Sequence, residues 1–465
     1  MSYKIIILYA IIFLVRFRRL KMKKVKFIDL FAGLGGIRLS FEQAFKELGY
    51  ETECVLTSEI KPSALKALKA NFKHKNLVGD ICKINEKEIE DFDFLLGGFP
   101  CQSFSSAGKG LGFADTRGTM FFEIARILKE KKPYGFILEN VEGLIKHDLK
   151  NKNDEIGQTF STILKILKEL GYKVKWKLLD SQYFGVAQSR KRVYIVGTLD
   201  KKINLDNFDV KNKVFKDIME HNQPTNNSKF SKALLSHYKP EELYGKSIKD
   251  KRGGKNNIHS WELGLKGKIT KDEINLLNKL LLERRKKKWA EEIGIDWMDG
   301  MPLTIQQISS FYDNDNLKSM LADLVSKKYL AYEYPKKIIE EFNETGHIIR
   351  KREYDTTKEK GYNIVSGKLS YEFSKIIDIN NVTPTLVAMD VAKMGVIDSG
   401  GIRSLTIREG LRLFGYPDSY SLDMFSDTKK GKTEAFDLLG NTVVISVMKE
   451  VISRVAREYD KKDTD

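Results

Sequence analysis

The sequence predicts an α/β fold built on parallel strands, together with a smaller α+β domain. Apolar runs of strand length alternate with helical patterns from about residue 25 to residue 199, and a Gly-rich turn follows the first run. This alternation stops after Leu199, where the chain becomes polar and rich in Lys and Asn, and it resumes near Thr383. Strands that alternate with helices are typical of parallel sheets with crossover connections. The 465 residues are enough for two or three domains.

The first 199 residues contain the expected parallel unit. An apolar run at 25–31 leads into the tight turn FAGLGG at 31–36, and the apolar residues over 37–48 fall on one helical face. Strand, Gly-rich turn and helix in this order open a nucleotide-binding α/β unit. The further strands that we expect are 54–57, 78–79, 92–99, 135–138, 174–179 and 192–198, and the further helices are 63–72, 119–130 and 156–170.

Two acidic residues stand where such a unit binds an adenosine group. Glu59 ends the second strand 23 residues after Gly36, a position from which a carboxylate binds a ribose diol. Asp80 ends the third strand and offers an acceptor to an adenine amine. The turn and the two acids fit S-adenosylmethionine as well as a dinucleotide. Ordinary caps of strand ends are the alternative interpretation.

A cysteine and a glutamate follow two further strands. Cys101 comes after Pro100 at the end of the apolar run 92–99, and Glu139 follows the run 135–138. The carboxyl ends of parallel strands meet at one edge of a sheet, so we expect the thiol and the carboxyl group to lie close together. Such a pair suits nucleophilic attack on an electron-poor ring whose nitrogen is protonated or hydrogen-bonded at the same time. The alternative is a buried structural Cys and a surface Glu.

The positive charge of the chain indicates a polyanionic partner. The net charge is +17, which favours nucleic acid, although solubility alone is an alternative reason for it. Within the segment QSRKR at 188–192, Arg190 and Arg192 point the same way if the backbone is extended. Two such guanidinium groups bind carbonyl or phosphate oxygens, and a basic surface strand is the alternative.

The cysteine content and the N-terminal segment bear on the compartment. Three cysteines in a chain of this length give no disulfide framework, and there is no Cys/His cluster with zinc spacing. We therefore expect a reduced, cytoplasmic setting and no metal. The apolar run 5–15 is shorter than the roughly 20 residues that span a bilayer. We interpret residues 1–21 as an extension outside the fold, with a membrane anchor as the alternative.

The domains expected from these patterns are 1–21, the extension; 22–199, the first part of the α/β domain; 200–395, the smaller domain; and 396–465, which returns to complete the α/β domain. Within the smaller domain, helices are predicted at 276–289, 304–311 and 317–329, with a strand at 329–334. Two short helices followed by a strand resemble part of a winged helix. A plain α+β insertion explains the same pattern equally well.

Six segments together resemble the DNA (cytosine-5-) methyltransferases of bacterial restriction–modification systems. They stand in family order over residues 25–199 and 380–455, while Glu59 and Asp80 match the second and third motifs and Thr385–Leu386 resembles the pair near the end of the family's target-recognition domain. The segments are FIDLFAGLGGIRLSF (27–41), GGFPCQSFSSAGKGLGFADTRGTMFFEI (97–124), FILENVEGL (136–144), QSRKR (188–192), RSLTIREGLRLFGYPDSY (403–420) and LLGNTVVISV (438–447).

The resemblance implies a Rossmann-like, S-adenosylmethionine-dependent methyltransferase domain with a mixed, mostly parallel sheet, plus an α+β target-recognition domain. It implies methylation of C5 of cytosine within a specific short double-stranded DNA sequence, which protects host DNA. Cys101 would attack C6 of a flipped-out base. Glu139 would hold the N3 edge and the exocyclic amine, Arg190 would contact the O2 side, and Arg192 would orient the loop and the carboxyl group.

The resemblance also implies binding residues and partners. The partners would be double-stranded DNA and, functionally, a cognate restriction endonuclease, with the enzyme a nucleoid-associated monomer in the cytoplasm. The cofactor site would comprise Phe31, Leu34, Gly35, Gly36, Glu59, Ile60, Asp80, Ile81, Pro100, Met120, Asn441 and Val443. The DNA contacts would come from Ser105, Arg117, Gln188, Thr385 and Leu386.

Two other functions are compatible with the same motifs. One is a tRNA cytosine-5 methyltransferase, in which the target-recognition region is short, whereas this chain has about 180 residues there. The other is a non-catalytic DNA-binding regulator that retains the fold, against which the intact Cys101, Glu139 and Arg190 argue. A nicotinamide dehydrogenase with the same Gly-rich turn would have no use for the Pro-Cys and Glu-Asn-Val pairs.

Overall fold

The computed structural model describes residues 23–100, 120–151, 153–250, 254, 256–342, 348–365, 372–387, 391–426 and 428–464. These residues form two compact units, each described here by itself. The first unit contains the chain up to Glu220 together with 379–392 and 405–465, and the second contains 221–378 together with 393–404. The first unit therefore extends 21 residues beyond the expected boundary at residue 199.

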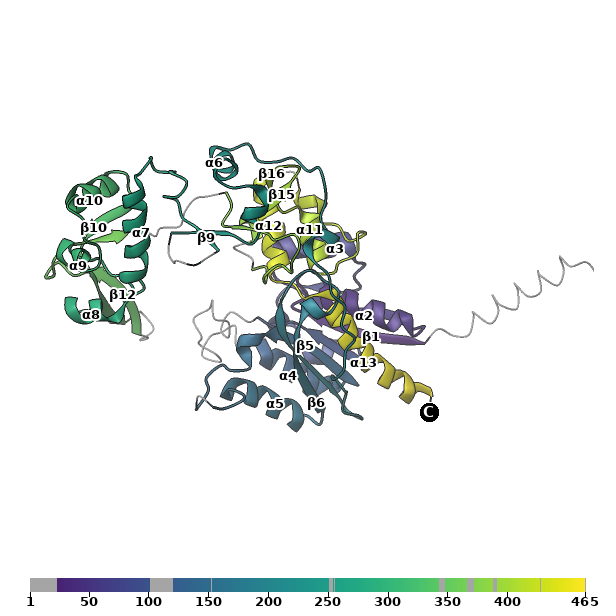
Figure 1. Ribbon diagram of the computed structural model, residues 1–465. Helices are drawn as coiled ribbons and strands as arrows, with labels where there is room; N and C mark the ends of the chain where they lie inside the picture. Colours follow the sequence, from purple (N-terminus) through teal and green to yellow (C-terminus); the bar gives the residue numbers. More distant parts are fainter. Residues whose placement is uncertain are drawn as a thin grey trace, which may run out of the picture. The chain divides into compact units, whose positions relative to one another are not determined.

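The first unit is built on a seven-stranded sheet with the strand order β3-β2-β1-β4-β5-β7-β6 (Figure 1). Strands β1 to β5 pair in parallel, while β7 runs antiparallel to both β5 and β6. The predicted mixed, mostly parallel sheet is confirmed. Its strands are β1 (Lys24–Leu30), β2 (Glu51–Ser58), β3 (Leu77–Val78), β4 (Phe94–Gly97), β5 (Gly135–Val141), β6 (Lys173–Asp180) and β7 (Lys191–Thr198).

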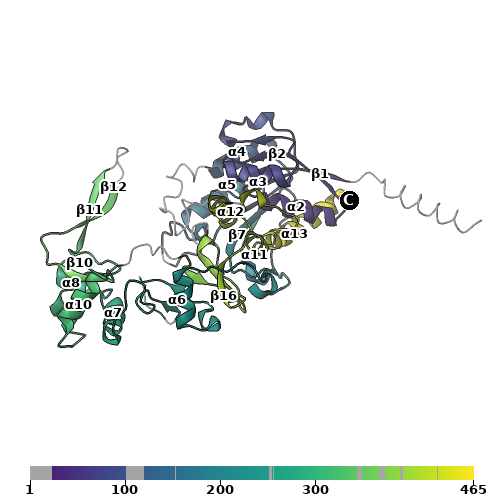
Figure 2. The same ribbon diagram turned by 90° about the horizontal axis from the view of Figure 1, so that it is seen from above.

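Helices from both ends of the chain cover this sheet. Helix α13 near the C-terminus packs against α2 from the first motif, as both views show (Figures 1 and 2). Tyr459 of α13 contacts the sheet through Phe94, with ring centroids 5.2 Å apart. The helices are α2 (Gly36–Glu47), α3 (Pro62–Asn71), α4 (Met120–Lys131), α5 (Gln158–Glu169), α11 (Ile407–Leu413), α12 (Lys429–Gly440) and α13 (Ile445–Thr464).

The register of the parallel strands brings four strand ends to one edge of the sheet. Leu30 pairs with Ser58 of β2 and with Gly97 of β4, and Gly97 pairs with Leu138 of β5. The residues that follow these positions therefore share one edge. In a parallel α/β sheet this carboxyl edge is where ligands bind.

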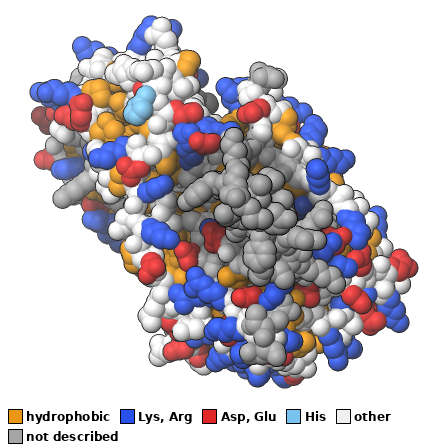
Figure 3. Space-filling view, turned by 90° about the vertical axis from the view of Figure 1, so that its right-hand side faces the viewer, with side chains coloured by type: hydrophobic (Ala, Val, Ile, Leu, Met, Phe, Trp, Pro, Cys, Tyr) orange, Lys and Arg blue, Asp and Glu red, His pale blue; other side chains and the backbone are white. Residues whose placement is uncertain are grey.

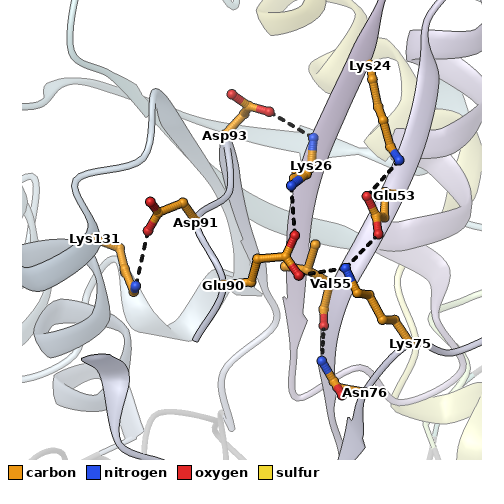
Figure 4. Close-up of polar contacts among 10 residues, drawn as sticks. All are labelled: Lys24, Lys26, Glu53, Val55, Lys75, Asn76, Glu90, Asp91, Asp93 and Lys131. Carbon is orange, nitrogen blue, oxygen red and sulfur yellow. Dashed lines mark hydrogen bonds and ion pairs between the residues drawn. The ribbon is translucent and has the colours of Figure 1, made fainter. Parts of the chain in front are cut away.

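Part of the positive charge on the first unit is neutralised by ion pairs. Figure 3 shows Lys and Arg side chains interspersed with Asp and Glu over one face. Away from the carboxyl edge, Lys75 Nζ lies 2.9 Å from Glu53 and 2.6 Å from Glu90, and Lys24 and Lys26 complete the chain of pairs (Figure 4). Hydrogen bonds from Lys26 and Lys75 lower the pKa of Glu90 to about 2. Such exposed pairs add little stability.

The second unit contains two separate hydrophobic clusters. One cluster packs α6 (Lys229–His237) against a five-stranded sheet with the order β16-β15-β14-β8-β9. The strands of this sheet are β8 (Ser247–Ile248), β9 (Asn257–Ile258), β14 (Lys375–Ile376), β15 (Met394–Asp398) and β16 (Gly401–Ser404).

The other cluster contains Trp261 and side chains of residues 269–365, and we call residues 269–365 the helical module. Its buried side chains come mainly from four helices and a small sheet. The elements are α7 (Lys271–Glu283), α8 (Lys287–Ile293), α9 (Ile305–Ser309), α10 (Leu317–Ser326), β10 (Leu330–Glu333), β11 (Lys336–Phe342), β12 (Ile348–Tyr354) and β13 (Gly361–Ile364).

Deleting residues 1–21 is expected to leave a stable protein that starts at Met22. Strand β1 begins at Lys24 and is paired on both sides, with β2 and β4, so the sheet has its full complement of described partners without the extension. Denaturant unfolding should give the same free energy within about 0.5 kcal/mol. Loss of folding or of cofactor binding in the truncated protein would show that the extension is structural.

The N-terminal apolar run 5–15 lies outside the described residues. Along the stretches that the structure describes, no helix combines the length and the apolar character needed to cross a membrane.

Candidate active site

A pocket of about 780 Å³ opens at the carboxyl edge of the seven-stranded sheet. It is lined by the Gly-rich turn, by residues that follow β2, β3 and β4, by the last residues of β5, and by the end of α12 together with Asn441. Of the residues predicted for the site, those on its wall are Phe31, Glu59, Ile60, Asp80, Ile81, Pro100, Met120, Glu139, Arg190, Arg192 and Asn441.

The carboxylate of Glu59 fixes the Gly-rich turn to the end of β2. It accepts hydrogen bonds from the backbone N–H groups of Gly33 at 2.8 Å, Ile60 at 2.8 Å and Lys61 at 2.7 Å. Two of these donors bond to Oε1 and one to Oε2, so one lone pair of Oε2 stays available on the pocket side. Glu59 thus shapes the pocket and still offers an acceptor to a ligand hydroxyl.

The neighbouring wall combines a second acceptor with apolar surface. Oδ1 of Asp80 accepts a hydrogen bond from the Cys82 N–H at 3.0 Å, and the carboxylate keeps further lone pairs for a ligand. Ile60 is 71% exposed, an uncommon state for a large aliphatic side chain in a folded protein. Phe31 has a φ of 57°, a left-handed conformation that costs a bulky residue about 1–3 kcal/mol. Strain and exposed apolar surface together indicate a ligand site.

Four residues expected to bind the cofactor are packed in or against the Gly-rich turn and are not among the residues that line the pocket. A Cβ atom at Gly35, where φ is +69°, would lie 2.5 Å from the ring of Phe72. A Cβ at Gly36 would lie 2.7 Å from Val443, so these two residues pack directly on each other. Leu34 is buried, and its carbonyl accepts a hydrogen bond from a tyrosine hydroxyl. The direct cofactor contacts predicted for Leu34, Gly35, Gly36 and Val443 stay predictions, because these residues are not among those that line the pocket.

Glu139 and Arg192 form an ion pair inside the pocket. Arg192 Nε lies 3.1 Å from Glu139 Oε1, and the two side chains are only 13% and 12% exposed. Burial raises the pKa of Glu139, while the charges of Arg192 and Arg190 oppose this rise. The carboxyl group is therefore poised to hold a proton at a higher pH than an ordinary glutamate does.

Asn140 joins the ends of two strands at the pocket, a role that sequence reasoning did not assign. Its Nδ2 donates to the Phe99 carbonyl at 3.2 Å, and its Oδ1 accepts from the Val141 N–H at 2.9 Å. Phe99 precedes Pro100, so this buried amide fixes the point at which the chain leaves β4. The sequence feature that could have pointed to Asn140 is its place directly after Glu139 in the Glu-Asn-Val motif.

Arg190 lies at the pocket wall, but its guanidinium group is engaged with the protein backbone. Nη1 donates to the Leu386 carbonyl at 2.9 Å, and Nη2 donates to the carbonyls of Gly440 at 2.9 Å and Thr442 at 3.0 Å. The side chain is almost fully buried. The two Nη atoms already have three protein acceptors, and the predicted contact of Arg190 with the O2 side of a cytosine stays a prediction.

Gln188 and Leu386 take part in the same buried network of hydrogen bonds as Arg190. Gln188 Nε2 donates to the Leu413 carbonyl at 3.0 Å, and its Oε1 accepts from the Leu386 N–H at 3.0 Å. Both side chains have no exposed surface in this structure, and the predicted DNA contacts of Gln188 and Leu386 stay predictions. Thr385 is partly exposed, and its hydroxyl donates to the Ser189 carbonyl at 2.7 Å.

Three predicted site residues, Cys101, Ser105 and Arg117, lie outside the described residues. The chain reaches the pocket wall at Pro100 and returns to it at Met120. Other lining residues that the sequence did not single out include Gly33, Ser58, Lys61, Cys82 and Leu438. Most of them adjoin a predicted residue in the chain, which was the available signal.

Replacing Arg190 with leucine is expected to lower the free energy of unfolding by about 3 kcal/mol or more. Three carbonyl groups would lose a buried donor, and each unmet group costs about 1–3 kcal/mol. Arg457→Leu is the matched control, because Arg457 is exposed on α13, and its effect should stay within about 0.5 kcal/mol. Denaturant unfolding measures both. Unchanged stability of the Arg190 variant together with lost turnover would instead indicate contact with the substrate.

Comparisons with known proteins agree over nearly the whole chain. The sequence profile of the family described as C-5 cytosine-specific DNA methylase matches residues 25–457. Type II methyltransferase M.NlaIV of Neisseria lactamica is 55% identical over 93% of this chain and 99% of its own length. M.BanI of Aneurinibacillus aneurinilyticus is 39% identical over 92% and 95%. The crystal structure of S. pombe Dnmt2 methyltransferase, 14% identical, aligns with 94% of this chain and 100% of its own at a TM-score of 0.50, a likeness of fold.

Proposed function

The chain belongs to the C-5 cytosine-specific DNA methylases, and we propose that it acts through Cys101 as nucleophile, with Glu139 and Arg192 holding the target base. The enzyme methylates cytosine at C5 within a specific DNA sequence and is a type II methyltransferase of a restriction–modification system. The observation that carries the assignment of roles is the buried Glu139–Arg192 pair on the pocket wall.

The pocket residues fit S-adenosylmethionine, the methyl donor of this family. Glu59 and Asp80 each retain an acceptor oxygen, which suits a ribose diol and an adenine amine, and the apolar surfaces of Phe31 and Ile60 suit the flat base. We therefore assign these four residues to cofactor binding, with Ile81, Pro100, Met120 and Asn441 completing the wall. When bound, the cofactor supplies a methyl group on a positively charged sulfur, the electrophile that this chemistry requires.

Cytosine needs activation because its C5 carbon is a weak nucleophile. We propose that the Cys101 thiolate adds to C6, which makes C5 electron-rich. The thiolate must approach perpendicular to the ring, and stacking in the duplex blocks that direction. The base must therefore be extruded, which costs a few kcal/mol. Once C5 carries the methyl group, loss of the C5 proton and elimination of the Cys101 thiolate restore the C5–C6 double bond.

Glu139 and Arg192 supply the groups that stabilise the activated ring. The raised pKa of Glu139 favours the protonated carboxyl group, which can donate to N3 as that atom gains electron density. The described contacts of Arg192 use two of its five N–H donors, one to Glu139 and one to the Lys191 carbonyl. The remaining donors suit the O2 side of the base, the role first expected of Arg190.

The proposed setting follows from the substrate. Host DNA and S-adenosylmethionine occur together in the bacterial cytoplasm, so we place the enzyme there in association with the chromosome. A single chain supplies every group that the proposed chemistry needs, which supports action as a monomer. A cognate endonuclease would be a functional partner, not a part of the active site.

Bisulfite sequencing of a plasmid expressed together with this gene tests the function. We expect 5-methylcytosine at one short DNA word and at no other cytosine. Parallel assays of the purified protein on duplex DNA and on tRNA should show methyl transfer to DNA alone. An unmethylated plasmid, or transfer to tRNA in preference to DNA, would refute the proposal.

A further inference from the structure

The helical module of the second unit has the topology of a winged helix. Leu303 pairs antiparallel with Tyr362 through hydrogen bonds of 3.0 and 2.7 Å, and β13 also pairs antiparallel with β10. These pairs place Leu303, as an isolated bridge, beside β13 on the side opposite β10, so that it extends this two-stranded sheet. Along the chain the module therefore runs from α7 to the Leu303 bridge, with α8 as an added helix between them, then to α9, α10, β10, the β11–β12 hairpin and β13. That order is the winged-helix order, with α9 and α10 as the helix-turn-helix.

We propose that α10 is the recognition helix of this module and reads base edges in the major groove, while the β11–β12 hairpin contacts phosphates as the wing. The proposal rests on the sequence-specific methylation of DNA described above. It assigns the reading of the DNA word to one helix, which family membership alone does not do. In helix-turn-helix proteins, the second helix enters the major groove and its N-terminal residues meet the bases.

The two faces of α10 differ as a recognition helix requires. Leu317, Met320, Leu321 and Leu324 are buried and fix the helix to the module core. The opposite face is exposed and consists of side chains that are short or flexible, so the helix can approach a groove closely. These exposed residues are Lys318, Ser319, Ala322 and Ser326.

The residues at the start of α10 are of the kinds that distinguish bases. Lysine bonds guanine, asparagine bonds adenine, and aspartate accepts from the cytosine amine. Asp315, Asn316 and Lys318 are exposed in this order around the first turn. The Asn316 N–H donates to Asn314, whereas the Asn316 side-chain amide makes no hydrogen bond to the described residues. Its donor and acceptor are thus available to an adenine edge.

The β11–β12 hairpin carries the cations that a wing needs. Register places Lys336 opposite Tyr354, Ile338 opposite Arg352, and Glu340 opposite Arg350, so these side chains share one face. Glu340 pairs with Arg350 at 2.8 Å, which leaves Lys336 and Arg352 as excess charge. Lys336 lies 4.8 Å from the ring of Tyr354, which is half-exposed. Figure 2 shows the hairpin extending away from α7, α8 and α10.

A protein partner is the other occupant that a winged helix accommodates. DNA is favoured because the exposed face of α10 contains no large apolar side chain, whereas protein interfaces are centred on such residues. Lysine, asparagine and serine on one face match base edges, and the cations of the hairpin match phosphates.

The test of α10 compares two double variants of the full-length enzyme. Asn316→Ala/Lys318→Ala removes the two proposed base contacts, and Asn275→Ala/Lys271→Ala removes the same residue types from the exposed face of α7. We expect kcat/KM on the cognate duplex to fall roughly 10- to 100-fold in the first variant, with relaxed preference at one or two base pairs in bisulfite sequencing. The α7 variant should stay within about twofold of the native enzyme, and cofactor binding should be unchanged in both.

Native kcat/KM and an unchanged DNA word in the α10 variant would overturn the assignment, as would equal losses in both variants. The two proposals fail in distinguishable ways. If the native enzyme methylates no DNA, the proposed function is wrong. If the native enzyme is active and the α10 variant is indistinguishable from it, only this inference is wrong, and a protein partner becomes the occupant to seek.

The hairpin is tested separately through the salt dependence of DNA binding. Lys336→Ala/Arg352→Ala should weaken binding to cognate and unrelated DNA alike. It should reduce the slope of log K against log salt by about 2, because each lost phosphate contact removes about 0.9 from the slope. Lys337→Ala/Lys351→Ala, on the opposite face of the hairpin, is the control. An unchanged slope in the first variant would overturn the assignment of the wing.

Discussion

Replacing Cys101 with serine is expected to lower methyl transfer to less than about a hundredth of the native rate, because the serine hydroxyl is a far weaker nucleophile than a thiolate at neutral pH. The proposed thiol is needed only for the covalent step at C6. Cofactor affinity and DNA affinity should therefore stay within about threefold of the native values. Single-turnover methylation, calorimetry with the cofactor and gel shift with the cognate duplex measure the three quantities.

The pattern of losses distinguishes a nucleophile from a structural cysteine. Cys54→Ser is the matched control, because Cys54 is buried in β2 away from the pocket and makes no proposed contact with substrate. That variant should lose stability, not turnover per folded molecule. Methylation by the Cys101 variant at near-native rate would refute covalent catalysis by this thiol.

Glu139→Gln is expected to lower kcat by about 10²- to 10⁴-fold with little change in the affinity for cofactor. Glutamine keeps the size of the side chain and can still form hydrogen bonds, but it cannot share a proton with N3. The ion pair with Arg192 would also be lost, since glutamine carries no charge. A native kcat in this variant would contradict the role of Glu139.

The pH dependence of kcat tests Glu139 without removing it. Burial raises the pKa of Glu139, so its protonated form persists to higher pH, and activity that needs this form declines as pH rises through the pKa. Arg192 lowers this pKa by its charge. Arg192→Ala should therefore move the alkaline limb of the kcat profile to higher pH, besides lowering kcat. A limb that stays in place or moves to lower pH would show that it belongs to another group.

Local patterns predicted the catalytic sheet because its chemistry sits next to strand ends. Alternating apolar runs located β1, β2, β4 and β5, and parallel pairing then required the residues after them to meet at one edge. Spacing therefore placed Glu59 and Asp80 at an adenosine site and Glu139 beside Cys101 at the edge of the sheet, and Glu59, Asp80 and Glu139 all line the pocket. Each of these residues lies at or just after the end of its own strand, so its position follows from the local sequence.

The roles of Arg190 and Gln188 could not be predicted in the same way. Both have partners that lie about 190 to 250 residues further along the chain, at Leu386, Leu413, Gly440 and Thr442. Alternation in an extended strand gave Arg190 and Arg192 the same direction, but β7 begins at Lys191, so Arg190 lies outside the strand. Distant backbone carbonyls, not local periodicity, determine where its guanidinium group points.

The winged-helix topology was also beyond local patterns. Two short helices and a strand were visible in the sequence, but a plain α+β insertion fitted them equally. The pairing of Leu303 with Tyr362 decides between these interpretations, and it joins residues 59 positions apart across α9, α10 and the hairpin. Because Leu303 pairs as a single bridge residue, the sequence around it contains no apolar run that would predict a strand.

Trapping the enzyme on DNA that carries 5-fluorocytosine at the target position is the most direct test of covalent catalysis by Cys101. Fluorine at C5 cannot leave as a proton does, so an enzyme that adds a thiolate to C6 and transfers a methyl group should stop as a covalent complex. We expect a complex that survives denaturation, forms only with cofactor present, and yields a peptide attached to DNA through Cys101. Absence of a denaturation-resistant complex from enzyme that methylates ordinary cytosine, or attachment through another residue, would rule out covalent catalysis by Cys101.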